Sequence, residues 1–102
     1  MKEPISAEQA RELFMENCVQ IARYWAKESR VDNEEDRCMG VVHSMLAMID
    51  GVGMVMPTMD LVLRPHPDDK QYHMDNGEDY FVDGMAINDG LYLHDELYSK
   101  KR

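Results

Sequence analysis

The stretch Cys38–Ile49 is the longest run of the chain without a charged residue, and it limits the possible folds more than any other segment. Apolar side chains recur there at steps of four and three, which places them on one stripe of an α-helix. The stripe consists of Cys38, Val42, Met45, Ile49 and Val52. Flanking apolar residues widen it, so we expect a central helix over about 33–50 that is covered on two sides.

A second helix precedes the central one. Ser6 can cap its start, and Gln9 stands three residues later, where a capping box has Glu or Gln. The apolar periodicity then continues to about residue 28, with Trp25 as an anchor in the core. Asp32, followed by Glu35, marks the start of the central helix. The sequence therefore predicts two packed N-terminal helices over about 6–28 and 33–50.

The rest of the chain has the features of a small β lobe, from about residue 58 to 83. Leu61–Leu63 is β-prone, and Asn76-Gly77 is typical of a type I′ turn. Residues 71–83 are then expected to form an antiparallel hairpin against Leu61–Leu63. A short helix over about 91–99 closes the chain. With 102 residues, 44% of them apolar, the prediction is a single domain over 1–102 of the α+β class.

The formal charge is −9, from 11 basic and 20 acidic residues, and it is distributed unevenly. Residues 60–96 carry ten acids and two bases, whereas the last three residues are all basic. This balance argues against direct binding to nucleic acid or to an anionic membrane. A basic protein surface is the favoured partner.

The two cysteines, Cys18 and Cys38, lie within helical patterns and not at the spacing of a metal or redox motif. We interpret them as reduced, buried thiols. The N-terminus lacks the apolar core of a signal peptide, and the 12-residue central run is too short to cross a bilayer. The expected compartment is the cytoplasm.

One cluster could support chemistry, because seven carboxylate or imidazole groups fall within fourteen residues. They are His66, Asp68, Asp69, His73, Asp75, Glu78 and Asp79. The simplest interpretation is a solvated acidic loop in which Asp and Asn form turns, with no cofactor. The alternative is a divalent metal held by His66, Asp69 and His73, with Asp68 as the base of a small metal-dependent hydrolase.

His66-Pro67-Asp68-Asp69 resembles the metal motif of the zinc-dependent N-acetylglucosamine deacetylases. In that family the His and the second Asp hold zinc, and the first Asp is the base. Here Lys70 replaces the usual acid, and no βαβ pattern surrounds the tetrad. We therefore interpret this match as coincidental.

The segment that follows the central helix is rich in methionine, with Met54, Met56 and Met59. Unbranched thioether side chains either fill gaps in a core or adapt to a partner. A third hypothesis is therefore a structural homo-oligomer, with this segment at a homodimer interface.

Four stretches of the sequence resemble short uncharacterised proteins encoded by tailed phages and prophages: residues 41–51, 59–62, 65–69 and 76–81. The resemblance extends over about residues 38–96 and carries no activity. It implies a small accessory protein made in a bacterial cytoplasm.

We expect a protein-interaction module and not an enzyme, in which two packed helices support an acidic lobe. The residues expected to face the partner are Asp68, Asp69, Asp75, Glu78, Asp79 and Asp83. Opposite charge would steer the partner to this lobe, and salt would weaken the attraction. A host nucleic-acid-binding protein, whose basic groove the lobe would occupy, is an example of such a partner.

Overall fold

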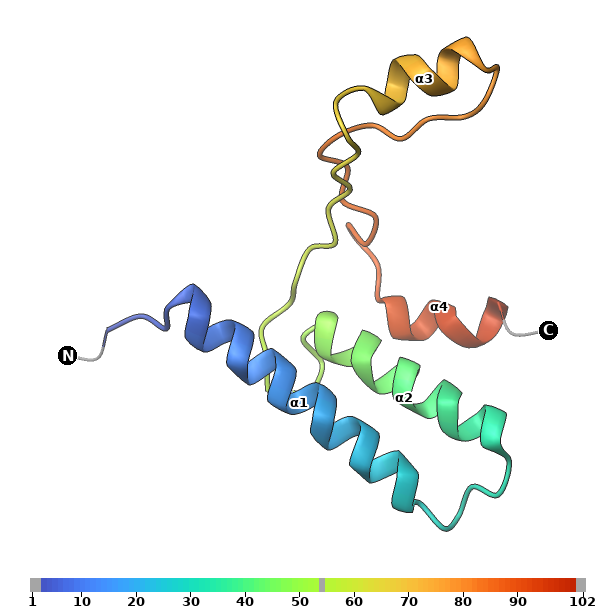
Figure 1. Cartoon of the computed structure of the whole chain (residues 1–102). Helices are drawn as coiled ribbons and strands as arrows, with labels where there is room; N and C mark the ends of the chain where they lie inside the picture. Colours follow the sequence, from blue (N-terminus) through green and yellow to red (C-terminus); the bar gives the residue numbers. More distant parts are fainter. Residues whose placement is uncertain (1–2, 54, 101–102) are drawn as a thin grey trace. The chain divides into compact units, whose positions relative to one another are not determined.

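The computed structural model describes residues 3–53 and 55–100, and the regular structure in them is helical (Figure 1). The helices are α1 (Ala7–Lys27), α2 (Glu34–Ile49), α3 (Asp69–Asp75) and α4 (Leu93–Lys100). Contacts divide the chain into two compact units. Unit 1 comprises Met1–Thr58 and Tyr92–Arg102, and unit 2 comprises Met59–Leu91. The expectation of one domain over 1–102 stays a prediction.

The predicted α+β class is wrong, because the described residues form no sheet. The segment expected to be the first strand of a hairpin is helix α3, and Asn76-Gly77 ends that helix. Asn76 has φ of −97° and Gly77 has φ of +66°. A type I′ turn needs positive φ at both positions, whereas a helix end needs it only at the glycine.

The extended segments of unit 2 pair only briefly. Val62 and Ala86 form an isolated antiparallel bridge, the one bridge in the described part of the chain. The N–H groups of Leu63 and Ile87 extend this contact by donating to Met85 O and Leu61 O, each at 2.9 Å. The β-prone Leu61–Leu63 therefore pairs with residues 84–87 and not with residues 71–83.

The start of α1 is as predicted. Ser6 Oγ accepts from the N–H of Gln9 at 3.1 Å, and Gln9 Oε1 accepts from the N–H of Ser6 at 2.9 Å. This capping box satisfies two backbone donors that the first turn would leave unpaired. The cap of α2 is Asn33, one residue after the expected Asp32, and its Oδ1 accepts from the N–H of Asp36.

In unit 1, α2 packs against both α1 and α4. Trp25 of α1 lies over Gly40 of α2, because a Cβ atom on Gly40 would come within 2.5 Å of the Trp25 Cδ2 atom. Trp25 Nε1 also donates to Ser44 Oγ at 2.9 Å. A large aromatic ring on a glycine, fixed by one hydrogen bond, therefore sets the contact between α1 and α2.

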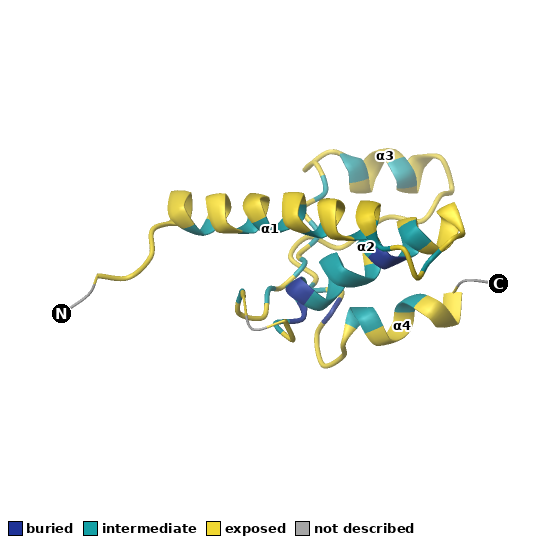
Figure 2. Cartoon of the chain, turned by 90° about the horizontal axis from the view of Figure 1, so that it is seen from below, coloured by how far each residue is buried: buried dark blue, intermediate teal, exposed yellow. Residues whose placement is uncertain are grey.

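The buried side of α2 is not the stripe that the sequence predicts. Cys38 and Val42 are exposed, whereas Gly40 and Met48 are buried. Met48, 5% exposed, is the one buried hydrophobic side chain among the described residues. Figure 2 shows accordingly that buried positions are few and that most of α1 is exposed. The interpretation of both cysteines as buried is also wrong, because Cys18 is half-buried and Cys38 is exposed.

Candidate functional site

Asn88 closes unit 2 by joining its two ends. The side chain is only 6% exposed, its Oδ1 accepts from the N–H of Leu61 at 2.9 Å, and its Nδ2 donates to Met59 O at 2.8 Å. Both polar ends of a buried amide are thus paired with backbone. At the base of the loop, these two bonds add to the backbone hydrogen bonds between residues 61–63 and 84–87.

Unit 2 carries eight acidic and two basic side chains, a formal charge of −6 in 33 residues. The six acids expected to face a partner all belong to this unit. Five of them are exposed and Asp69 is half-buried: Asp68, Asp69, Asp75, Glu78, Asp79 and Asp83. We refer to these six residues as the acidic set.

Members of the acidic set also have contacts within unit 2. Asp69 Oδ2 accepts from the N–H of His66 at 3.1 Å. Asp69 lies at the start of α3, where the helix dipole stabilises a carboxylate. Asp75 Oδ1 accepts from Gln71 Nε2 at 2.7 Å. Asp83 lies 3.7 Å from the guanidinium of Arg64, and both side chains are largely exposed, so this pair is weak.

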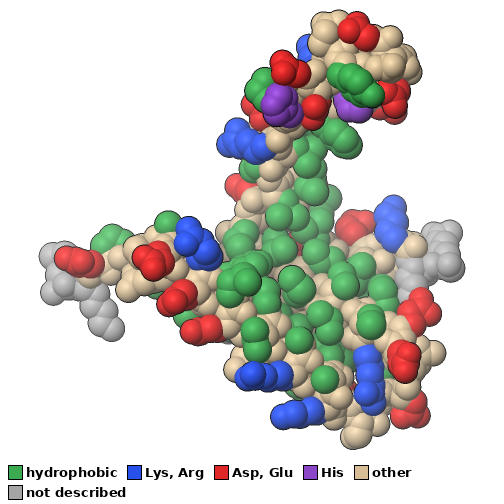
Figure 3. Space-filling model, viewed as in Figure 1, with side chains coloured by type: hydrophobic (Ala, Val, Ile, Leu, Met, Phe, Trp, Pro, Cys, Tyr) green, Lys and Arg blue, Asp and Glu red, His purple; other side chains and the backbone are tan. Residues whose placement is uncertain are grey.

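Large apolar side chains of unit 2 are exposed beside these acids. They are Val62, Tyr72, Met74, Tyr80, Phe81, Val82, Met85, Ile87 and Leu91. Phe81 is the most exposed of them, at 67%. On the face seen in Figure 3, acidic side chains of this unit lie among hydrophobic ones. A surface that combines exposed aromatic rings with negative charge is suited to binding a protein.

A hollow of about 360 Å³ lies in this unit, formed by Pro65–Pro67, Lys70 and Tyr80–Asp83. The ammonium group of Lys70 lies 5.3 Å from the centre of the Tyr80 ring. This distance is within the range of a cation–π interaction. The Tyr80 ring at the hollow is therefore already paired with a cation from the same chain, Lys70.

The structure does not bring the predicted metal ligands together. His66 Nδ1 lies 3.8 Å from Asp68 Oδ2, and His73 Nδ1 lies 3.5 Å from Glu78 Oε1. Within residues 3–53 and 55–100, no three His, Cys, Asp or Glu side chains are arranged to hold an ion. The imidazoles of His66 and His73 thus face different carboxylates, those of Asp68 and Glu78, and Asp69 instead accepts from the backbone N–H of His66. A divalent metal at this cluster stays an untested alternative.

Sequence reasoning missed an acid–histidine pair in unit 1. Asp50, 3% exposed, accepts from the backbone N–H groups of Leu93 and His94, each at 2.9 Å. Its Oδ2 atom also lies 2.6 Å from Nδ1 of His94. No local pattern could indicate this pair, because its members are 44 residues apart.

These contacts determine the charge state of Asp50. Burial raises the pKa of its carboxyl group, but the hydrogen bonds from the backbone N–H and the ring of His94 and from the N–H of Leu93 lower it. The hydrogen bonds prevail, so the pKa lies below the usual value and the carboxylate stays ionised. Asp50 therefore supplies the negative charge that the positive end of the α4 dipole favours.

The contacts of the pair hold the start of α4. The second ring nitrogen of His94, Nε2, lies 3.2 Å from Asp95 Oδ1, so both nitrogens face carboxylates. The ring is further fixed by edge-to-face contact with His43, at 5.4 Å between centroids, and by Tyr92 at 5.8 Å.

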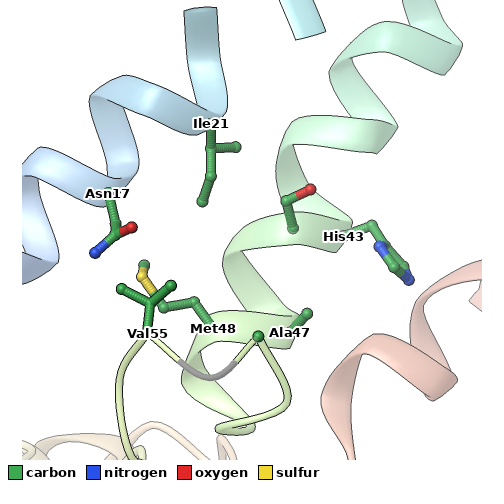
Figure 4. A pocket seen from close by; sticks show the side chains of 8 residues that line it. Asn17, Ile21, His43, Ala47, Met48 and Val55 are labelled. Atoms are coloured by element: carbon green, nitrogen blue, oxygen red, sulfur yellow. The ribbon is translucent and has the colours of Figure 1, made fainter. Parts of the chain in front are cut away.

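A pocket of about 270 Å³ opens between α1, α2 and the turn after α2 (Figure 4). Its apolar lining includes Ile21, Ala47, Met48 and Val55, and Asn17, His43 and Ser44 add polar atoms. Asn17 and Ser44 already have partners, since Asn17 Nδ2 donates to Leu13 O and Ser44 accepts from Trp25. The pocket is thus mainly a gap between packed elements.

The structure describes two of the three methionines in the methionine-rich segment. Met54 lies outside the described residues, and Met56 and Met59 are half-buried. The proposal that this segment forms a homodimer interface stays untested.

Across residues 3–53 and 55–100, no helix combines the length and the hydropathy that crossing a bilayer requires. Comparison with family models, with curated proteins and with solved structures finds no match to the chain. The resemblance to phage and prophage proteins therefore stays a prediction.

Proposed function

We propose that the protein is a non-enzymatic interaction module that binds a basic protein surface through unit 2. One observation carries this proposal: the acidic set and the exposed rings of Tyr72 and Phe81 belong to the same small unit. Negative charge would attract the partner, and the apolar side chains would supply contact area once the partner is in place.

A nucleic-acid-binding protein has a surface of the required sign, and it is the partner class that we propose. The resemblance to phage and prophage proteins fits this class, because such a protein would meet its host partner in the cytoplasm. The two free cysteines, Cys18 and Cys38, fit the same reducing compartment.

A defined peptide tests the proposal. A labelled peptide of alternating arginine and leucine is titrated with the full chain, and binding is followed by fluorescence anisotropy. A peptide in which glutamate replaces arginine is the control for charge. We expect binding to the arginine peptide only, with a loss of affinity of at least tenfold between about 50 and about 500 mM salt.

Two triple variants locate the site. Asp75→Asn/Glu78→Gln/Asp79→Asn removes three charges from the acidic set, and Glu3→Gln/Asp32→Asn/Glu96→Gln removes three exposed charges from unit 1. The first variant should lose most of the binding and the second should keep it. Equal loss in both variants, or binding that is independent of salt, would show that unit 2 is not the binding surface.

A further inference from the structure

Helix α1 has a second apolar stripe on a different face from the one that contains Trp25. Met15, Val19, Ala22 and Ala26 follow steps of four, three and four, which is the spacing of a coiled-coil seam. All four are exposed, Met15 at 57% and Val19 at 47%. The face toward α2 carries the half-buried residues instead, among them Phe14, Ile21 and Trp25.

Charged residues flank this stripe in a self-complementary order. Glu12 and Glu16 precede its centre, and Arg23 and Lys27 follow it. The pairs Glu12 with Lys27 and Glu16 with Arg23 share a centre between residues 19 and 20, one residue from the centre of the stripe, which lies between residues 20 and 21. A second copy of α1 in the antiparallel direction would therefore place each acid beside a base.

The helix dipole does not account for this order. Acids favour the first turn of a helix and bases the last, and the effect fades beyond those turns. In α1 the first turn contains Glu8 and the last contains Lys27. Glu12, Glu16 and Arg23 lie between those turns.

The same order is unfavourable within a single helix. Glu12 and Glu16 are four residues apart and have like charge, as do Arg23 and Lys27. Such pairs destabilise an isolated helix slightly. A parallel copy would add further repulsion, because each charge would face its own counterpart.

We propose that the chain forms a homodimer in which two α1 helices pack antiparallel along Met15, Val19, Ala22 and Ala26. Val19 of one copy then lies opposite Ala22 of the other, and the small alanine side chains permit close approach of the helices. Glu16 of each copy faces Arg23 of the second. This inference concerns unit 1 and does not depend on the proposed function of unit 2.

Sedimentation equilibrium of the full chain over a range of concentrations tests the inference. We expect a reversible monomer–dimer equilibrium for the wild type. Glu16→Arg or Arg23→Glu alone should each weaken the dimer by about tenfold, because like charges then meet twice in each dimer. The double variant Glu16→Arg/Arg23→Glu should return to within about threefold of the wild type.

Two further variants serve as checks. Val19→Glu should abolish the dimer, and Glu3→Arg, which makes the same charge change as Glu16→Arg outside the helix, should leave it intact. Circular dichroism verifies that each variant keeps its helices. A wild type that stays monomeric at all concentrations would overturn the inference, and so would a dimer that is indifferent to the single swaps or not restored by the double one.

Discussion

Asp50 Oδ2 lies 2.6 Å from His94 Nδ1, and this contact joins the end of α2 to the start of α4. The same carboxylate accepts from the first two backbone N–H groups of α4. One buried side chain therefore satisfies donors that the short helix could not satisfy itself. That single group therefore fixes the start of α4, and the packing of α4 on α2 adds to it.

Replacing Asp50 by Asn should lower the free energy of unfolding by about 3 kcal/mol, because the buried site loses a charge that accepts three hydrogen bonds. Urea unfolding, followed by the fluorescence of Trp25, measures the change. Asp60→Asn removes the same charge at an exposed position and is the control. Similar losses in the two variants would contradict a special role for Asp50.

The stability that Asp50 provides should depend on pH with a definite sign. Its folded pKa is lowered below the usual 3.8, so the carboxylate binds fewer protons in the folded than in the unfolded chain. The contribution is complete well above pH 3.8 and is lost as the pH falls through the lower folded pKa. The gap in unfolding free energy between the wild type and Asp50→Asn should therefore narrow below about pH 4. A gap that stays constant down to pH 2 would disprove this linkage.

Gly40→Ala should separate α1 from α2 locally. The new methyl group would come within 2.5 Å of the Trp25 ring. The contacted atoms belong to a rigid ring and not to the mobile end of a long side chain, so they cannot move away easily. We expect a loss of about 1–3 kcal/mol and a red shift of the tryptophan emission. In Gly53→Ala the added Cβ meets nothing within 4 Å, so this variant should change stability by less than about 1 kcal/mol.

Asn88→Ala should loosen unit 2 alone. The variant removes the two side-chain hydrogen bonds of Asn88 and leaves the N–H of Leu61 unsatisfied. Amide exchange at Leu61 should accelerate about tenfold or more, while exchange in α2 stays unchanged. Asp89→Asn, an exposed neighbour, should leave both rates as they are. Faster exchange throughout the chain would mean that Asn88 supports both units.

Zinc or manganese should not stabilise the chain, because His66, Asp69 and His73 do not converge on one point. Thermal unfolding of untagged protein with and without each ion measures this. A rise in melting temperature that His66→Ala and His73→Ala abolish would instead support the metal-dependent alternative.

The features that could be predicted are those that depend on residues close together in the sequence. The capping box at Ser6 and Gln9 is confirmed, and the observed bounds of α1 and α2 differ from the expected ones by one residue at each end. The crowding of acids in residues 60–96 is also a property of the sequence itself, and most of it falls in unit 2.

The features that could not be predicted depend on contacts between distant residues. Asn76-Gly77 suits a hairpin turn or a helix end equally well, and the seven residues before it are too few for a decisive pattern. The buried side of α2 is set by the Trp25 ring, which requires Gly40, and apolar periodicity alone favours Val42. The Asp50–His94 pair spans 44 residues and has no local signature.

The hydrogen bonds of Asp50 also define a boundary for protein engineering. Thr58, the last residue of unit 1 before the chain enters unit 2, donates its hydroxyl to Asp50 O at 3.1 Å, and Leu93, just after the chain returns, donates to Asp50 Oδ1. The departing and the returning chain are thus tied to the same residue. Residues 59–91 form a cassette whose excision, with Thr58 rejoined to Tyr92 through a short glycine-serine bridge, would preserve every bond that Asp50 makes. Other loops could be grafted onto the same stem.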